Sequence, residues 1–267
     1  MAERVTGPTS EMRRELLRRV VATVDATNQL YAEAKLFPLD INPQPILYFG
    51  DPLTAKFATF GVNPAAAELT LPRWPNRTMT VEELDRRKAS YFKNPDVTPS
   101  RWFDGYDGPS KALSFLGHSY RSDTIHLDFS PRATTPRATA AKKLSNLDLR
   151  LFVQRFREMV VADLQWFIST LALCPNVKAA IMAGAVTNRR RDYLDQFLQE
   201  HLPRTHKLTL RRYLELQRPG ATALYDLVGP QLSIPVLFVS ASPSGDRGTK
   251  LAREVKRNLD TPRQAGF

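Results

Sequence analysis

The chain has almost no cysteine and few histidines. Cys174 is the only cysteine among 267 residues, which excludes an intramolecular disulfide. It also excludes an iron–sulfur cluster held by several cysteines. The four histidines show no spacing typical of a zinc site. We therefore expect a protein without a metal and without any other cofactor.

Long apolar runs are also missing. No stretch approaches the roughly 20 apolar residues that a membrane-spanning helix needs. The N-terminal residues Met1-Ala2-Glu3-Arg4 are not followed by the apolar core of a signal peptide. We expect a cytoplasmic protein that does not bind a membrane, and we expect a monomer.

Positive charge, in contrast, is abundant. Lysine and arginine number 38 against 27 acidic residues, which gives a net charge of +11. A basic chain of this size favours a polyanionic partner, most often nucleic acid, although solubility alone is the alternative. Arginine clusters such as Arg189-Arg190-Arg191 suit bidentate contacts with phosphate.

Apolar periodicity predicts alternating helices and strands. Expected helices cover residues 9–35 (with Ser10 as the cap), 81–91, 146–173, 185–202 and 250–259. Expected strands cover residues 46–49, 55–60, 124–128, 177–182, 207–214 and 235–239, the first two forming a hairpin. Buried apolar strands that alternate with helices indicate an α/β protein, with a mostly parallel central sheet in a three-layer α/β/α arrangement.

The same pattern predicts the domain organisation. Residues 1–42 are expected to form an N-terminal helix and a linker packed on the domain. Residues 43–260 are expected to form one α/β domain, with an irregular insert at 70–110 that is rich in proline, arginine and aromatic residues. Residues 261–267 are expected to be a tail.

Two small polar turns directly follow predicted strands. Gly61-Val62-Asn63-Pro64 follows residues 57–60, and Ser242-Pro243-Ser244-Gly245 follows residues 236–239. Between them lies the segment Ile125-His126-Leu127-Asp128-Phe129-Ser130-Pro131-Arg132-Ala133-Thr134. Ligands of open α/β sheets bind at the carboxyl ends of strands, where such turns lie.

These three segments resemble, in order and spacing, the motifs of the uracil-DNA glycosylase superfamily. The first resembles its water-positioning Gly-x-Asn-Pro motif, and the last resembles the [His/Asn]-Pro-Ser-[Pro/Gly] motif that closes on the DNA strand. The middle segment resembles the base-reading strand, which ends in Asn and is followed by Arg-x-Thr. The resemblance covers roughly residues 43–260. It implies the three-layer fold of that family and a monofunctional enzyme that flips a base out of DNA and hydrolyses its N-glycosidic bond.

The resemblance also implies roles for individual residues. Asn63 would hold the attacking water, although before a proline it is equally a turn former. Ser242 stands where family members carry His or Asn, and it can donate one hydrogen bond but cannot carry positive charge. Ser244 and Gly245 would contact phosphates, and Arg247 would fill the gap left by the flipped base, or would be a surface arginine.

Asp128 departs from the family, which has Asn at this place to read uracil. A carboxylate cannot donate to O4 of uracil, but it can accept from the exocyclic amino group of cytosine. The sequence therefore favours a modified cytosine, such as the glucosylated 5-hydroxymethylcytosine of phage DNA on which anti-phage members of the superfamily act. The alternative is a structural carboxylate that caps nearby amides or pairs with Arg132.

Further residues are expected to form the base pocket. Gly61 would let the backbone approach the base, and Phe103 would stack on it, with Trp102 and Tyr106 as rivals. For any of these aromatic residues, core packing is the alternative. His126 is interpreted as structural, on the expectation that it faces away from Asp128.

Three other functions remain open from the sequence. One is a repair glycosylase for uracil or another deaminated base. A second is a non-catalytic nucleic-acid-binding module that keeps the fold, which the serine at position 242 favours. The third is an unrelated α/β enzyme acting on a soluble nucleotide, which the net charge of +11 disfavours.

Overall fold

The chain divides into two compact units, each made of separate segments. A computed structural model describes residues 8–33, 45–61, 79–132, 163–184, 209–215, 222–229, 232–243 and 248–258. The first unit takes Met1–Ala55, Asn63–Tyr91 and Leu127–Asn176, and the second takes Lys56–Val62, Phe92–His126 and Val177–Phe267. The domain boundaries predicted near residues 42 and 260 lie outside the described residues.

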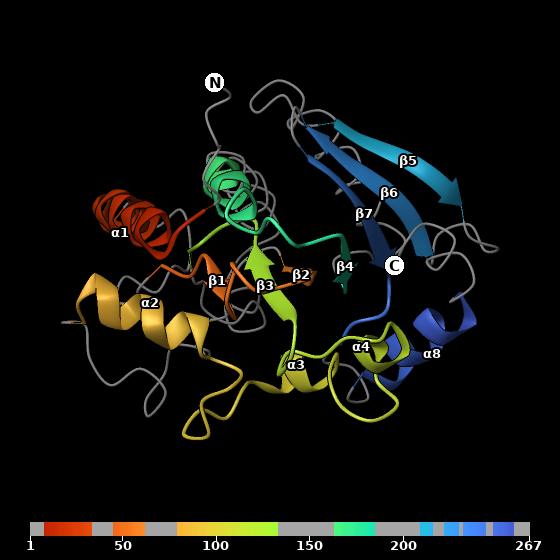
Figure 1. The fold of residues 1–267 in the computed structure, drawn as a ribbon. Coiled ribbons are helices and arrows are strands. Elements are labelled where there is room, and N and C mark those ends of the chain that lie inside the picture. The colour runs from red at the N-terminus through yellow and green to blue at the C-terminus, as the bar shows by residue number, and fades with distance from the viewer. Residues whose placement is uncertain are drawn as a thin grey trace, which may run out of the picture. The chain divides into compact units, whose positions relative to one another are not determined.

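Two helices lie side by side in the first unit (Figure 1). They are α1 (Ser10–Glu33) and α2 (Val81–Ala89), close to the ranges predicted from periodicity. The cap of α1 is Thr9, whose Oγ1 accepts a hydrogen bond from the Met12 amide at 3.3 Å, so the prediction of Ser10 was wrong by one residue. Thr80 caps α2 in the same way, through the Glu83 amide.

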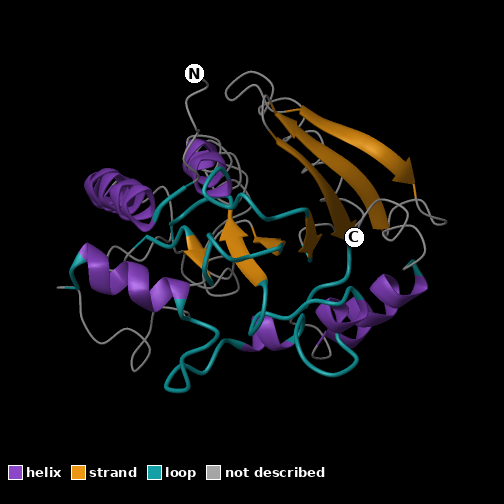
Figure 2. Cartoon of the chain, in the orientation of Figure 1, coloured by secondary structure: helices purple, strands orange, loops and turns teal. Residues whose placement is uncertain are grey.

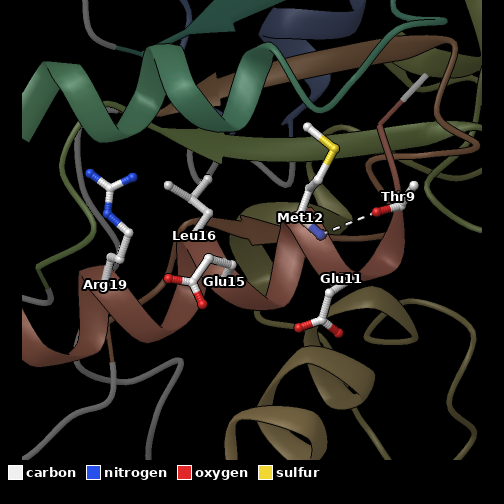
Figure 3. A pocket seen from close by; sticks show the side chains of 6 residues that line it. All are labelled: Thr9, Glu11, Met12, Glu15, Leu16 and Arg19. Carbon is white, nitrogen blue, oxygen red and sulfur yellow. Dashed lines mark hydrogen bonds between the residues drawn. The ribbon is translucent and has the colours of Figure 1, made fainter. Parts of the chain in front are cut away.

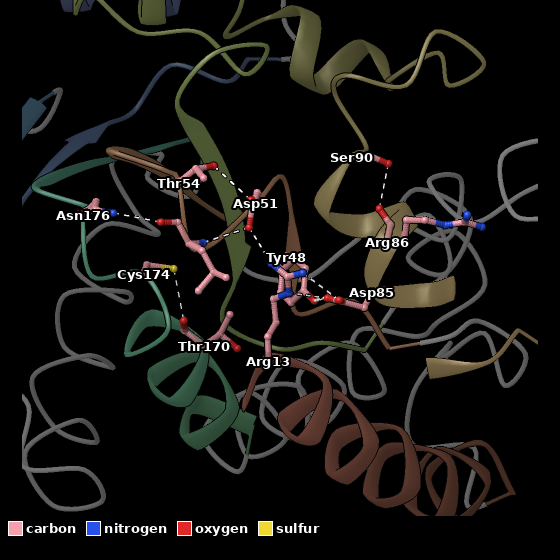
Figure 4. A network of polar contacts seen from close by, with 11 residues as sticks. Arg13, Tyr48, Asp51, Thr54, Asp85, Arg86, Ser90, Thr170, Cys174 and Asn176 are labelled. Carbon is pink, nitrogen blue, oxygen red and sulfur yellow. Dashed lines mark hydrogen bonds and ion pairs between the residues drawn. The ribbon is translucent and has the colours of Figure 1, made fainter. Parts of the chain in front are cut away.

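A buried ionic network joins these helices to the short strand β1 (Tyr48–Phe49) and the turn after it (Figure 4). The Arg13 guanidinium donates two hydrogen bonds to the Asp85 carboxylate, at 2.6 and 2.9 Å, and a third to Asp51 at 2.7 Å. The Tyr48 hydroxyl also donates to Asp85. Burial, with the nearby Asp85 charge adding to it, raises the pKa of Tyr48, so its hydroxyl stays protonated as a donor. The charged groups are thereby paired rather than left alone in the interior.

Lys88 lies entirely buried beside this network. Its amine donates a hydrogen bond to the Pro45 carbonyl. Burial lowers the pKa of Lys88 to about 7, although the charge of Asp85 opposes the shift. The unfolded chain, with the ordinary lysine pKa of 10.5, therefore binds more protons than the folded chain between pH 7 and 10.5.

We expect Lys88 to make the free energy of unfolding depend on pH. Below pH 7 the folded chain holds the buried ammonium in its charged form, which is unfavourable. The free energy of unfolding therefore rises as the pH increases from 7 towards 10, by at most about 1.4 kcal/mol per pH unit. Urea unfolding of the native chain and of Lys88→Met at several pH values measures this. The free energy of unfolding of the native chain minus that of Lys88→Met should rise with pH. A difference that stays constant would contradict the assignment.

The second unit is built on a mixed sheet, drawn as orange arrows in Figure 2. Its strands are β2 (Phe57–Gly61), β3 (Thr124–Asp128), β4 (Ala179–Ala183), β5 (Thr209–Glu215), β6 (Thr222–Gly229) and β7 (Leu232–Val239). They lie in the order β3-β2-β4-β7-β6-β5. Strand β3 ends in the first unit, to which Leu127 and Asp128 belong.

The middle of the sheet is parallel and one side is antiparallel. Strands β2, β4 and β7 pair in parallel, whereas β6 pairs antiparallel with both β7 and β5. Every residue of β4 is buried, as are the first four of β2. Full burial of a large apolar side chain such as Ile181 contributes about 1.5–3 kcal/mol, so these apolar runs form the centre of the core.

Three helices complete the described part of the second unit: α3 (Arg101–Asp104), α4 (Ala112–Phe115) and α8 (Thr249–Arg257). The helices α4 and α8 pack together, as Figure 1 shows. The α/β class predicted from the sequence is confirmed. The predicted hairpin of the first two strands is wrong, because β3 stands between β1 and β2 in the sheet order. The predicted helix at 185–202 lies outside the described residues.

Candidate functional site at the carboxyl ends of the parallel strands

Two of the three sequence motifs begin at one edge of the second unit's sheet. Because β2, β4 and β7 are parallel and in register, their carboxyl ends share that edge. Gly61 is the last residue of β2, and Ser242 follows the end of β7 at Val239. The end of β4, at Ala183 and Gly184, stands between them.

Gly184 was not expected from the sequence to take part in this edge. Its φ angle of +73° lies in the left-handed region that favours glycine, and its amide donates to the Val239 carbonyl at 3.1 Å. A Cβ atom here would lie 3.2 Å from both Ser242 Cα and Pro243 Cδ. Glycine therefore allows the end of β4 to pack directly against the Ser242–Pro243 turn.

Two further glycines bring distant segments against this turn. A methyl group on Gly105 would overlap the Pro243 carbonyl, and one on Gly248 would overlap the Gly105 carbonyl. Gly248 also has a positive φ angle of +74° and precedes α8. The Pro243 turn, the end of α3 and the start of α8 are thus packed backbone to backbone. Glycine is required at both places, because any side chain would force the segments apart.

Aromatic side chains of the 92–126 region pack below this backbone contact. The Phe103 ring makes edge contacts with Phe92, Tyr120 and His126, with ring centroids 5.0–5.4 Å apart. Phe103 is 3% exposed, so the described structure has it in the core, whereas the adjacent Trp102 is partly exposed. Stacking of Phe103 on a base stays a prediction.

Tyr106 connects this aromatic region to the sheet edge. Its hydroxyl accepts a hydrogen bond from the Ala183 amide at 3.0 Å, at the last residue of β4. Within residues 79–110, which the sequence suggested to be irregular apart from one helix, the structure has the helices α2 and α3 and the buried side chains of Phe92, Phe103 and Tyr106. The preceding residues 70–78 of that predicted insert lie outside the described residues.

A buried polar chain runs beside the aromatic rings. The Thr59 hydroxyl lies 2.7 Å from the Tyr120 hydroxyl and 2.8 Å from His126 Nδ1. This geometry agrees with a structural role for His126. The reason given for that role was wrong, however: His126 and Asp128 are two residues apart in a regular strand and share one face.

Asp128 is the last residue of β3 and is 4% exposed. The residues after it form a separate buried ion pair: Arg132 donates two hydrogen bonds to the Asp163 carboxylate, at 2.7 and 3.0 Å. The Ser130 hydroxyl donates to the same carboxylate at 2.7 Å. Arg132 thus pairs with Asp163, which the sequence did not single out, and its pairing with Asp128 stays a prediction.

Four of the predicted site residues lie outside the described residues. They are Asn63, Ser244, Gly245 and Arg247. Their roles in holding water, contacting phosphate and filling the base stack therefore stay predictions from the sequence. The described residues before them, Gly61 and Pro243, lie where the chain leaves β2 and β7.

An open depression lies elsewhere, along α1 (Figure 3). Its described lining residues are Thr9, Glu11, Met12, Glu15, Leu16 and Arg19. None of them is a strand-end residue or belongs to a sequence motif. The polar groups are flexible surface side chains on one helix, which does not converge several donors on one point as ligand sites do. We therefore do not place the functional site there.

Within the described ranges, no three His, Cys, Asp or Glu residues gather closely enough to hold a metal ion. No helix in those ranges is long and apolar enough to cross a membrane. Comparison with known proteins gives no match to a protein-family model, to a curated protein or to a solved structure.

Proposed function

We propose that this protein is a monofunctional DNA glycosylase with the three-layer fold of the uracil-DNA glycosylase superfamily. It flips a base out of DNA and hydrolyses the bond between the base nitrogen and C1′ of the sugar. Water supplies the hydroxyl group that remains on C1′, and the base leaves with the electron pair of the broken bond. The product is an abasic site.

One observation carries this proposal: two turns that resemble the family's motifs begin at the same edge of the parallel part of one sheet. Gly61 ends β2 and Ser242 follows β7, with β4 paired in parallel to both strands. Because β2, β4 and β7 are parallel, the segments that follow β2 and β7 leave the sheet at this shared edge. It is also the edge at which open α/β sheets bind ligands.

Each turn has its own part in the proposed reaction. The Asn63 amide orients the water below C1′, and the Gly61 backbone leaves room for the base. Ser242 donates one hydrogen bond to the departing base. Ser244 and the Gly245 amide hold phosphates of the bent strand, and Arg247 fills the space that the base leaves.

In this proposal, Asp128 determines which base the enzyme removes. An ionised carboxylate accepts hydrogen bonds only, and N4 of cytosine is a donor, whereas O4 of uracil is an acceptor. We propose a modified cytosine as the substrate, because an enzyme that removed ordinary cytosine would destroy the DNA of its own cell. A requirement for a large 5-substituent, such as the glucosylated hydroxymethyl group of phage DNA, gives the needed selectivity.

A panel of duplexes that contain uracil, cytosine, 5-hydroxymethylcytosine or its glucosylated form tests the proposal. We expect alkali to reveal strand breaks in the modified-cytosine duplexes alone. Asn63→Ala should lower this excision by roughly 100-fold or more, because it removes the group that positions the water. DNA affinity should change little.

The possible outcomes separate the candidate functions. Excision of uracil alone would replace the assigned substrate by a deaminated base. Tight DNA binding without excision of any base would support the non-catalytic binding module, which the serine at position 242 favours. Excision that survives Asn63→Ala would contradict the assigned role of Asn63.

A further inference from the structure

Helix α8 differs in charge from the other long helices of the described chain. Its nine residues include four basic residues and one acidic residue. In contrast, α1 has four basic and four acidic residues, and α2 has three of each. Among the described helices, α8 therefore carries the largest excess of positive charge.

The cations of α8 occupy the side opposite its buried face. Lys250, Arg253 and Arg257 are spaced three and four residues apart, which places them along one side of the helix. All three are exposed. The apolar residues, Leu251 and Val255 among them, are buried, and α8 packs on α4. A membrane-surface helix would need this apolar side free, so the charged side is what α8 presents to a partner.

Within α8, Glu254 is the one acidic residue. Glu254 pairs with Arg257 at 3.0 Å, within the same helix. Ion pairs between exposed side chains are weak, because water screens them, and a multivalent anion displaces them readily. With four basic residues against one acidic residue, α8 keeps a net positive charge.

The start of α8 is fixed at the edge of the sheet that carries the two motifs. Gly248, which precedes the helix, is packed on the Gly105 carbonyl, and Gly105 is packed on the Pro243 carbonyl. Lys250 follows Gly248 by two residues. The cationic side of α8 thus begins beside the Ser242–Pro243 turn and leads away from it.

We infer that the cationic side of α8, formed by Lys250, Arg253 and Arg257, binds phosphates of the DNA backbone next to the base that is removed. The identity of the partner rests on the proposed function. A repeated positive charge along a helix fits a partner with repeated negative charge, and arginine suits phosphate geometry. These contacts carry affinity and position the strand, and they do not read the base.

The triple variant Lys250→Ala, Arg253→Ala, Arg257→Ala tests the inference. Fluorescence anisotropy with a labelled duplex gives the dissociation constant at several salt concentrations. Each lost phosphate contact lowers the slope of log affinity against log salt by about 0.9, so three lost contacts lower it by roughly 2.7. We expect at least tenfold weaker binding at about 0.1 M salt.

A matched control removes the same charge from another helix. Arg14, Arg18 and Arg19 lie on α1, and the first two are already paired with glutamates. Their triple alanine variant should keep the native salt slope. Equal losses in both variants would overturn the inference, because they would show a general effect of net charge. An unchanged slope in the α8 variant, or no salt-dependent binding by the native chain, would also overturn it.

The same experiment separates this inference from the proposed reaction. If the native chain excises no base but the α8 variant alone loses DNA affinity, the binding face stands and the glycosylase proposal fails. If excision occurs and the α8 variant binds and cleaves like the native chain, the glycosylase proposal stands and the binding face is wrong. RNA of the same length, used as competitor, distinguishes a preference for DNA from general polyanion binding.

Discussion

Replacement of Asp128 by Asn should move the base preference from modified cytosine towards uracil. Asn keeps the size of the side chain but adds an amide donor, which can reach O4 of uracil, and it keeps only one acceptor for N4 of cytosine. A correct pair of hydrogen bonds discriminates by about 1–3 kcal/mol, so each preference should change by roughly ten- to a hundredfold. The ratio of kcat/KM on the two substrates measures the change.

The control for this prediction is another carboxylate of the same chain. Asp104 is exposed at the end of α3, and Asp104→Asn removes the same charge without touching β3. It should leave the ratio of kcat/KM unchanged. If Asp128→Asn lowers both activities equally, and its thermal unfolding matches that of the native chain, Asp128 does not read the base.

The strand that carries Asp128 could be predicted from the sequence. The strand Thr124–Asp128 was predicted with the bounds that the structure gives. Its residues Thr-Ile-His-Leu-Asp alternate between polar and apolar, and such alternation is a local signal of a strand. The carboxyl ends of β4 and β7 were predicted within one residue from short apolar runs, whereas their starts differ by two and three residues.

Non-local pairings could not be obtained in this way. Strand β6 was not predicted, because Asp226 interrupts its apolar pattern, and its pairing with β7 is what defines it. The first two strands are close in sequence and were expected to pair as a hairpin. The order of the sheet instead separates them by β3, which comes more than 60 residues later.

The backbone contacts around the candidate site could not be predicted from the sequence, for a related reason. Gly105 and Pro243 are more than 130 residues apart, and nothing local in the chain marks their approach. A glycine in a loop is usually a turn residue, so its role as a contact point emerges only with the fold. The strand ends before Gly61 and Ser242 could be predicted from local patterns, whereas the glycines packed against the Ser242–Pro243 turn could not.

Removal of the Asp163 carboxylate should destabilise the chain more than any surface charge change. Arg132 and Asp163 have side chains that are 4% and 1% exposed, and Asp163→Ala would leave the guanidinium buried without this partner. Breaking a buried ion pair from one side costs about 3–5 kcal/mol in comparable cases. Urea or thermal unfolding of the variant measures the loss.

The pair itself is not expected to be a strong source of stability. Burial raises the pKa of Asp163 in spite of the hydrogen bonds from Arg132 and Ser130. The unfavourable desolvation of the carboxylate is therefore larger than the stabilisation that these partners provide. The double variant Arg132→Met, Asp163→Leu should therefore regain most of the stability that Asp163→Ala loses. Such recovery in a double-mutant cycle is the signature of a buried pair.

A surface arginine supplies the matched control. Arg18 is paired with Glu11, Glu15 and Glu82, yet it is 41% exposed, and Arg18→Ala should leave the unfolding midpoint close to that of the native chain. The ion pairs of Arg18 are exposed to water, whereas the Arg132–Asp163 pair is buried. If Arg18→Ala is as damaging as Asp163→Ala, or if the double variant is no more stable than Asp163→Ala, burial is not what makes the Arg132–Asp163 pair sensitive.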